Sequence, residues 1–173
     1  VTAGVTKRGT NHVSLSSTAT GSSADKNVGN AKPVTVTGFT LAGNDSGNYN
    51  VVQPTGLSAN VTQATLTLST GNVTKAYDGT TSAAGAPVVT GGTLFTGDSL
   101  SGGSFAFANK NASAGDKVVS VSGVTVSDGN SGANYSVSYA SNTTSTITPA
   151  PLTISTNSVT KTYDGNTGAP GTA

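Results

Sequence analysis

The chain has 173 residues, of which 9% are charged, and its formal net charge is +1. This length fits one large domain or two small ones. Binding to nucleic acid or to a membrane surface needs a basic patch, and so weak a charge argues against both. Cysteine is absent, which excludes disulfides and thiolate metal sites. No apolar run reaches the roughly 18 residues of a membrane span and no signal peptide is recognisable, so an export signal or anchor is expected outside these residues.

The composition predicts strands and turns rather than helices. All seven acidic residues are aspartate, and none is glutamate. Residues that favour helices, such as Glu, Lys, Gln and Leu, are scarce, whereas Val, Thr, Ser, Asn and Gly are abundant.

Alternation of apolar and polar residues places the predicted strands. At Gly38 and at Gly123 the alternation slips by one residue, and a glycine at such a slip predicts a β-bulge. No helical stripe is present. Six or seven short strands in about 86 residues predict an all-β fold of tandem small antiparallel β-sandwiches, immunoglobulin-like in the loose sense. In chain order, the predicted strands are 12–19, 34–41, 49–53, 57–62, 65–70, 73–77, 98–108, 119–126, 135–140 and 143–148.

The sequence repeats itself with a period of 86 residues. Five blocks keep their order and nearly their spacing, so small slips fall in loops. The blocks, each followed by its second copy, are 24–27 and 108–111, 34–38 and 119–123, 48–49 and 134–135, 64–68 and 150–154, and 77 and 163.

The phase of this repeat predicts three domains. Residues 1–64 form an incomplete repeat that lacks its first strands, residues 65–150 form a complete repeat, and residues 151–173 are the first strands of a following repeat. A unit this small buries only roughly 60–65% of its unfolded surface, which favours end-to-end packing of neighbouring units.

The clearest motif occurs twice, as VTKAYDGTT at 73–81 and as VTKTYDGNT at 159–167. In the first copy, alternation puts Lys75 and Tyr77 on one face of a strand, so the Tyr77 ring is expected to cover the edge of the core with Lys75 along it. Asp78-Gly79 is typical of a turn, because Asp accepts from backbone amides and Gly takes positive φ. A ligand cluster is the functional alternative, but hairpin turns need the same residues. The second copy repeats these roles at Lys161, Tyr163, Asp164 and Gly165.

Two further tyrosines hold equivalent places. Tyr49 and Tyr135 each open a predicted strand near the end of a unit. That placement resembles a tyrosine corner, in which the phenol bonds back to the backbone. A structural role is therefore predicted for both.

Other segments keep a fixed order around these motifs: ADKNVG at 24–29, LAG at 41–43, GNY at 47–49, GD at 97–98 and ITPAPLTI at 147–154. The whole series resembles the YDG- and MBG-type tandem repeats of bacterial surface adhesins, including filamentous-haemagglutinin-like exoproteins. The resemblance covers essentially the whole chain, in permuted phase. It implies an all-β module arrayed in tandem in a stalk or filament, located outside the cell or on the bacterial surface, without enzyme activity.

The chain departs from this pattern in its first copy. Ser23 stands where the second copy has Phe107, and Asn11-His12 stands where it has Gly97-Asp98. The first unit is therefore expected to be less tightly packed.

Catalytic and metal-binding interpretations have little support. GDSLSGG at 97–103 resembles the start of a serine hydrolase motif with Ser99 as nucleophile, but the only histidine, His12, lies in the other unit. The seven aspartates are scattered without the spacing of a calcium loop, although a calcium site built from separate loops stays open. A covalent Lys–Asn or Lys–Asp crosslink at Lys75 or Lys161 also stays open. We expect no enzyme activity, no metal and no cofactor.

The sequence favours a structural repeat module of an extracellular bacterial fibre or adhesin stalk, whose partners are further copies of itself joined head to tail. Either the chain is a window of a longer repetitive polypeptide, which is favoured, or it is a subunit whose last strands insert into the next subunit. The alternative function is adhesive recognition of a host or matrix glycan or protein, which needs a cluster of exposed aromatic side chains. The residues predicted to form the inter-unit strand are Leu152, Ile154, Val159 and Tyr163.

Overall fold

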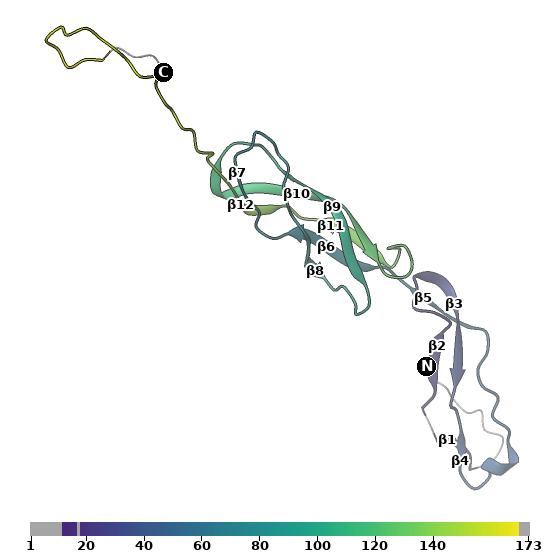
Figure 1. The fold of residues 1–173 in the computed structure, drawn as a ribbon. Coiled ribbons are helices and arrows are strands. Elements are labelled where there is room, and N and C mark those ends of the chain that lie inside the picture. Colours follow the sequence, from purple (N-terminus) through teal and green to yellow (C-terminus); the bar gives the residue numbers. More distant parts are fainter. Residues whose placement is uncertain (1–11, 17, 170–173) are drawn as a thin grey trace.

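The computed structural model describes residues 12–16 and 18–169, and the only helix in them is the short 3-10 turn η1 (Ser46–Asn48). The all-β prediction is therefore confirmed. Figure 1 shows an elongated molecule in three parts. We call the described residues up to 62 the first unit, residues 63–148 the second unit and residues 149–169 the tail. Within these residues, no helix is long and apolar enough to cross a membrane.

The two units lie end to end, and the tail leaves the second unit at the end far from the first (Figure 1). The strands of the first unit are β1 (Ser14–Leu15), β2 (Thr20–Ser23), β3 (Gly29–Thr37), β4 (Leu41–Ala42) and β5 (Leu57–Val61). The strands of the second unit are β6 (Ala64–Thr70), β7 (Thr74–Ala76), β8 (Pro87–Gly92), β9 (Ser99–Phe107), β10 (Ser113–Ser127), β11 (Tyr135–Tyr139) and β12 (Asn142–Thr148).

The second unit contains two sheets. One has the strand order β7-β12-β10-β9, and the other has the order β11-β6-β8. The prediction of antiparallel sheets is wrong for two pairs, because β7 runs parallel to β12 and β6 runs parallel to β11. Parallel neighbours need a long crossover connection, and the chain between β6 and β11 provides one by passing through β7 to β10.

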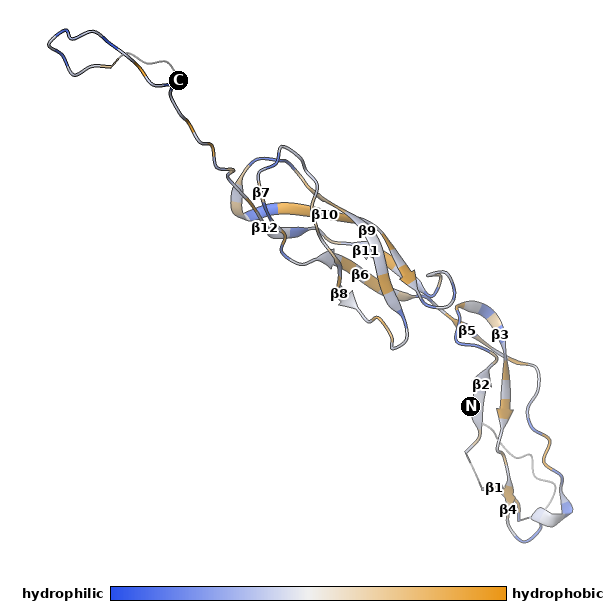
Figure 2. Cartoon of the chain, in the orientation of Figure 1, coloured by the Kyte–Doolittle hydropathy of each residue, from blue (hydrophilic) through white to orange (hydrophobic). Residues whose placement is uncertain are grey.

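Strand β10 links the two apolar clusters of the second unit. Its first half contributes Val119 to one cluster, and its second half contributes Val126 to the other. Figure 2 shows apolar residues along β10 and few in the tail. The first cluster consists of Val73, Ala83, Phe107, Val119 and Ile147, and the second of Leu66, Leu68, Val126 and Tyr135.

The change of face within β10 occurs at Gly123, as the alternation predicted, but no bulge forms against β9. The pairs Ser122–Ser104 and Val124–Gly102 keep one continuous register. Gly123 and the facing Gly103 both have positive φ, of 65° and 103°. The bulge prediction is wrong here because both strands turn together, which needs a glycine on each side.

The first unit repeats part of this pattern. Its sheet β2-β3-β5 has the same order as β9-β10-β12. Ser23 faces Val34 as Phe107 faces Val119, so the predicted Ser23–Phe107 equivalence is confirmed.

The short β1–β4 ladder corrects one predicted equivalence. Leu15 faces Leu41 as Leu100 faces Val126. This register makes Val13, rather than His12, the equivalent of Asp98. Asn11 lies outside the described residues.

The predicted strand at 49–53 is wrong. The equivalent strand β11 exists because it pairs with β6, with Tyr135 opposite Ala64 and Val137 opposite Leu66. No equivalent of β6 lies beside 49–53 in the described residues, and Tyr49 and Val51, on the face that β11 buries, are 40% and 37% exposed. The alternation was correct, but a strand also needs a neighbour to pair with.

Two strands were not predicted. In β2 the sequence Thr-Gly-Ser-Ser has no apolar alternation, and in β8 a proline and two glycines interrupt it. Both form because neighbouring strands offer backbone partners, β3 for β2 and β6 for β8.

Candidate inter-unit interface

The YDG turn of the second unit is closed by a lysine. Lys75 Nζ donates to Asp78 Oδ1 at 2.8 Å and to the Thr80 carbonyl at 2.9 Å, and the Thr80 amide donates to the same Asp78 oxygen at 2.9 Å. Gly79 takes positive φ, 78°, as predicted. The Lys75 ammonium, and to a smaller extent the amide and hydroxyl of Thr80, lower the pKa of Asp78 to about 2.

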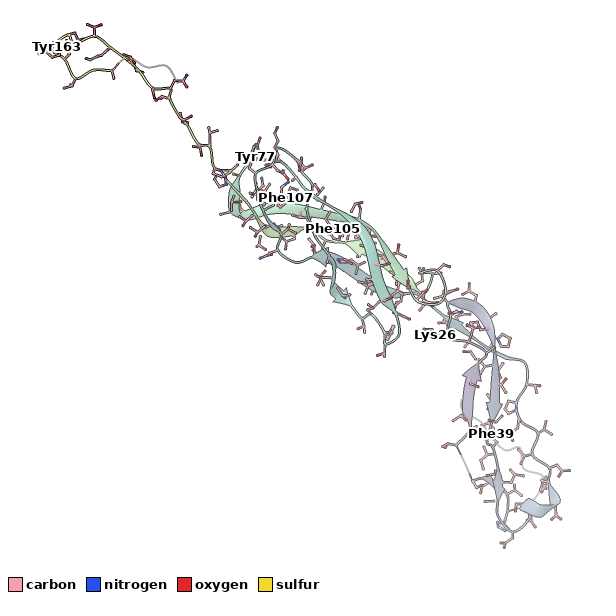
Figure 3. All side chains as sticks on the ribbon, viewed as in Figure 1. Lys26, Phe39, Tyr77, Phe105, Phe107 and Tyr163 are labelled. Carbon is pink, nitrogen blue, oxygen red and sulfur yellow. The ribbon has the colours of Figure 1, made fainter. Side chains whose placement is uncertain are left out.

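The aromatic ring under Lys75 is Phe107 rather than the predicted Tyr77. The Lys75 Nζ lies 5.5 Å from the centroid of the Phe107 ring. Tyr77 is 40% exposed and lines a hollow with Pro149 and Leu152, at the end of the unit where the tail begins. Figure 3 labels Tyr77 beside Phe107 at that end. Tyr77 therefore lies at the boundary between the second unit and whatever follows it.

The tail builds the same turn. Lys161 Nζ donates to Asp164 Oδ1 at 2.9 Å and to the Asn166 carbonyl at 2.6 Å, and Gly165 has a φ of 75°. The Lys161 ammonium lowers the pKa of Asp164. The tail contains no strand, so local residues are sufficient to close this turn.

Two further lysines use the same arrangement, and sequence reasoning missed them. Lys32 Nζ donates to Asp25 Oδ1 in the first unit, and Lys117 Nζ donates to Asn109 Oδ1 in the second. The signal was present in the repeat, which places each pair at equivalent positions of its unit. Lys75 and Lys161, the lysines considered for a covalent crosslink, bind their aspartates as ion pairs.

Tyr135 holds the end of the second unit that faces the first unit. Its hydroxyl donates to Asp98 Oδ2 at 2.6 Å and accepts from the Phe95 amide at 3.0 Å, so a bond to backbone forms as predicted. Burial and the Asp98 carboxylate raise the pKa of Tyr135. Tyr49, the equivalent residue of the first unit, is 40% exposed, whereas Tyr135 is only 5% exposed.

A loop beside Tyr135 presents Asn134 to the first unit. Asp128 is buried and accepts from the amides of Asn130, Gly132 and Asn134, at 2.7, 2.8 and 3.0 Å. Burial alone would raise the pKa of Asp128, but these amides outweigh it and the net effect lowers the pKa. The loop is therefore fixed around its own carboxylate.

Polar contacts join the two units. Lys26 Nζ of the first unit lies 3.3 Å from Asp98 Oδ1 of the second. The Val28 amide donates to Asn134 Oδ1 at 2.9 Å, and Asn134 Nδ2 donates to Asn27 Oδ1 at 3.2 Å. Figure 3 shows Lys26 where the units meet. The Asp98 side chain is only 6% exposed in this arrangement.

Apolar side chains complete this joint. They line a hollow between the units, with Lys26, Asp98 and Asn134 at its polar side. The apolar members of the lining are Val28, Val61, Ala64 and Phe95, with the ring of Tyr135.

The tail carries apolar side chains that are exposed. Leu152 and Ile154 are 86% and 75% exposed, whereas their equivalents Leu66 and Leu68 are completely buried. Val159 and Tyr163, the other residues predicted for the inter-unit strand, are exposed as well.

The residues considered for catalysis are not brought together. Ser99 begins β9 of the second unit, while His12 lies in the first unit, where its amide donates to Asp45 Oδ2 at 2.8 Å. Within residues 12–16 and 18–169, no three histidine or acidic side chains form a group that could hold a metal ion.

Comparison with known families gives one match. The family model described as YDG domain matches residues 1–56 and again residues 62–144. No curated protein and no solved structure matches the chain significantly.

Proposed function

The chain belongs to the YDG domain family, and from that premise we propose that it is a structural repeat module of an extracellular bacterial fibre or adhesin stalk. Successive units of about 86 residues, each a small immunoglobulin-like sandwich, are joined head to tail. Residues 151–173 complete the sandwich of a following unit of the 1–64 type. Catalysis has no part in this function.

One observation carries the proposal: the tail carries the strand residues that the first unit lacks. In the second unit, β6 pairs in parallel with β11, and Leu66 and Leu68 are completely buried. In the first unit, 49–53 has no such neighbour among the described residues, while the tail exposes Leu152 and Ile154. Moving this apolar surface out of water favours pairing by roughly 25 cal/mol per Å².

The second unit also supplies the register of the proposed pairing. There, Ser138 is opposite Thr67, and their hydroxyl oxygens are 3.0 Å apart. A shift of 86 residues puts Val52 opposite Thr153 of another copy. Neighbouring strands lie about 4.8 Å apart, within the range that a disulfide can bridge.

The test is disulfide formation between chains. A chain carrying Val52→Cys and Thr153→Cys is oxidised, and the native absence of cysteine leaves no competing thiol. Position 52 belongs to the first unit and position 153 to the tail, and these two parts lie on opposite sides of the second unit (Figure 1), so a disulfide is expected to join different chains. We expect a ladder of covalent oligomers in denaturing electrophoresis. The control, Val52→Cys with Ser155→Cys, moves one thiol two residues along the same strand face and should yield far less product. Equal yields from both pairs would refute the proposed register.

The alternative of an adhesive binding module has weaker support. It required a cluster of exposed aromatic side chains. Phe95 lies at the end of the second unit that meets the first unit, and Tyr77 lies at the end that meets the tail. The other exposed rings lie in the first unit (Tyr49), at the end of β11 (Tyr139) and in the tail (Tyr163). The exposed rings are therefore distributed over three parts of the molecule, which suits end-to-end assembly better than one binding surface.

A further inference from the structure

The end of the second unit next to the tail repeats the surface by which the first unit holds the second. Strand registers support the equivalence, because Gly29 faces Val61 in the first unit as Ser113 faces Ile147 in the second. Residues Lys110, Asn111, Ala112, Ile147, Thr148 and Ala150 correspond to Lys26, Asn27, Val28, Val61, Thr62 and Ala64.

In the second unit this surface is uncovered. Two hollows open there, one lined by residues that include Asn111 and Ala112, the other by residues that include Ala112 and Ile147. Lys110 is exposed, and no ion-pair or hydrogen-bond partner for its side chain is found in the part of the chain that the structure describes. Lys110 is thus an exposed cation next in sequence to Asn111, which lines one of these hollows, as Lys26 would be if the second unit were removed.

The occupied joint shows what a partner must bring. Asp98 is nearly buried between Lys26 and the Tyr135 hydroxyl. A carboxylate is costly to bury unless it is paired and hydrogen-bonded. A partner for the uncovered surface should therefore carry both a carboxylate and a buried tyrosine that bonds it.

We propose that this surface docks a further YDG unit that has an aspartate at the position of Asp98, and that Lys110 pairs with that carboxylate. The proposal rests on the head-to-tail assembly given above as the function. It adds a rule for which unit can follow. A unit like the second, with aspartate at that position, forms the ion pair with Lys110, which we call the latch. A unit like the first, with Val13 at that position, docks without this ion pair.

One contact of the occupied joint does not recur. Gln63, the first residue of the second unit, donates from Nε2 to the Ala133 carbonyl at 3.1 Å beside the first joint, but Pro149 occupies the equivalent position and has no side-chain donor. At the proposed joint between the second unit and a further unit, the Lys110 ion pair would therefore be a larger share of the polar contacts than the Lys26 ion pair is at the first joint.

The experiment uses an extended chain in which residues 1–150 are followed by a second copy of residues 65–173. The appended Asp98 then faces Lys110. Spin labels on cysteines at Thr35 and Ser120, both exposed on equivalent strands, report the first joint. A second sample labelled at Ser120 in both copies reports the new joint. Pulsed electron paramagnetic resonance measures the two distance distributions. We expect the distribution across the new joint to be as narrow as the distribution across the first joint.

Charge reversal then tests the latch. Lys110→Glu should broaden the distribution at the new joint, and appended Asp98→Lys in the same chain should narrow it again. Appended Asp98→Val, which copies the first unit, should broaden it like Lys110→Glu. Lys26→Glu is the matched control, because it should broaden only the first joint.

Hydrogen exchange at residues 150–156 in the first copy of a head-to-tail fusion of two whole chains, where a following unit is present, separates the two proposals. If these amides are protected but the distance distribution at the new joint does not change with Lys110→Glu, the latch is refuted and the head-to-tail assembly is still supported. Absence of protection would refute the head-to-tail assembly itself.

Discussion

The first and second units contain the same three-strand arrangement, β2-β3-β5 and β9-β10-β12, but equivalent residues next to it differ in burial. Tyr135 is almost fully buried and β11 is a strand, whereas the equivalent Tyr49 is partly exposed and 49–53 is not a strand. The tail shows the converse, since Leu152 is exposed where its equivalent Leu66 is buried. Burial in this protein therefore depends on which strand supplies the neighbour as much as on the residue itself.

The largest expected difference in stability is between substitutions at two equivalent leucines, Leu66 and Leu152. Leu66→Ala should destabilise the second unit by about 2–5 kcal/mol, the usual cost of truncating a buried leucine. Leu152→Ala in the same chain should change stability by less than about 0.5 kcal/mol, since the side chain is exposed. Urea unfolding of both variants measures the difference.

A head-to-tail fusion of two copies of the chain sharpens this comparison. There, Leu152→Ala in the first copy should cost about as much as Leu66→Ala, because the following unit now buries Leu152. A cost that stays near zero in the fusion would show that the two leucines are not equivalent.

Part of the architecture was predictable from the sequence, and the errors at 49–53, β2 and β8 have one origin. Alternation and the 86-residue interval located the YDG turns and the Ser23–Phe107 equivalence. They could not show that, in the part of the chain that the structure describes, no strand equivalent to β6 pairs with 49–53, because pairing is a property of another segment. The ladders of β2 and β8 were missed for the same reason, since their partners rather than their own residues create them.

The joint between the units was also beyond sequence reasoning. Lys26 and Asp98 are separated by 72 residues, and nothing local marks them as partners. Asp128 gave no signal either, because its ligands are backbone amides, which any residue carries. The repeat did contain one unused clue, namely Lys110 at the equivalent position to Lys26.

The smallest expected effect concerns the YDG turn of the second unit. The folded pKa of Asp78 is lowered to about 2, below the usual value of about 4. The turn should keep its full stabilisation from Asp78 above about pH 4 and lose it as the pH falls toward 2. Lys75→Gln removes the largest cause, so the Asp78 midpoint should rise toward 4. An NMR titration of the Asp78 carboxyl carbon measures both midpoints, and an unchanged midpoint in the variant would contradict the lysine-closed turn.

The central claim is that the tail becomes a buried strand when another unit follows it. Hydrogen exchange of the amides at 150–156, measured in the single chain and in the fused double chain, tests it most directly. The claim predicts rapid exchange in the single chain when it is too dilute to pair with other copies and, in the first copy of the fusion, slow exchange comparable with that of β6. Rapid exchange at these amides in both chains would contradict it.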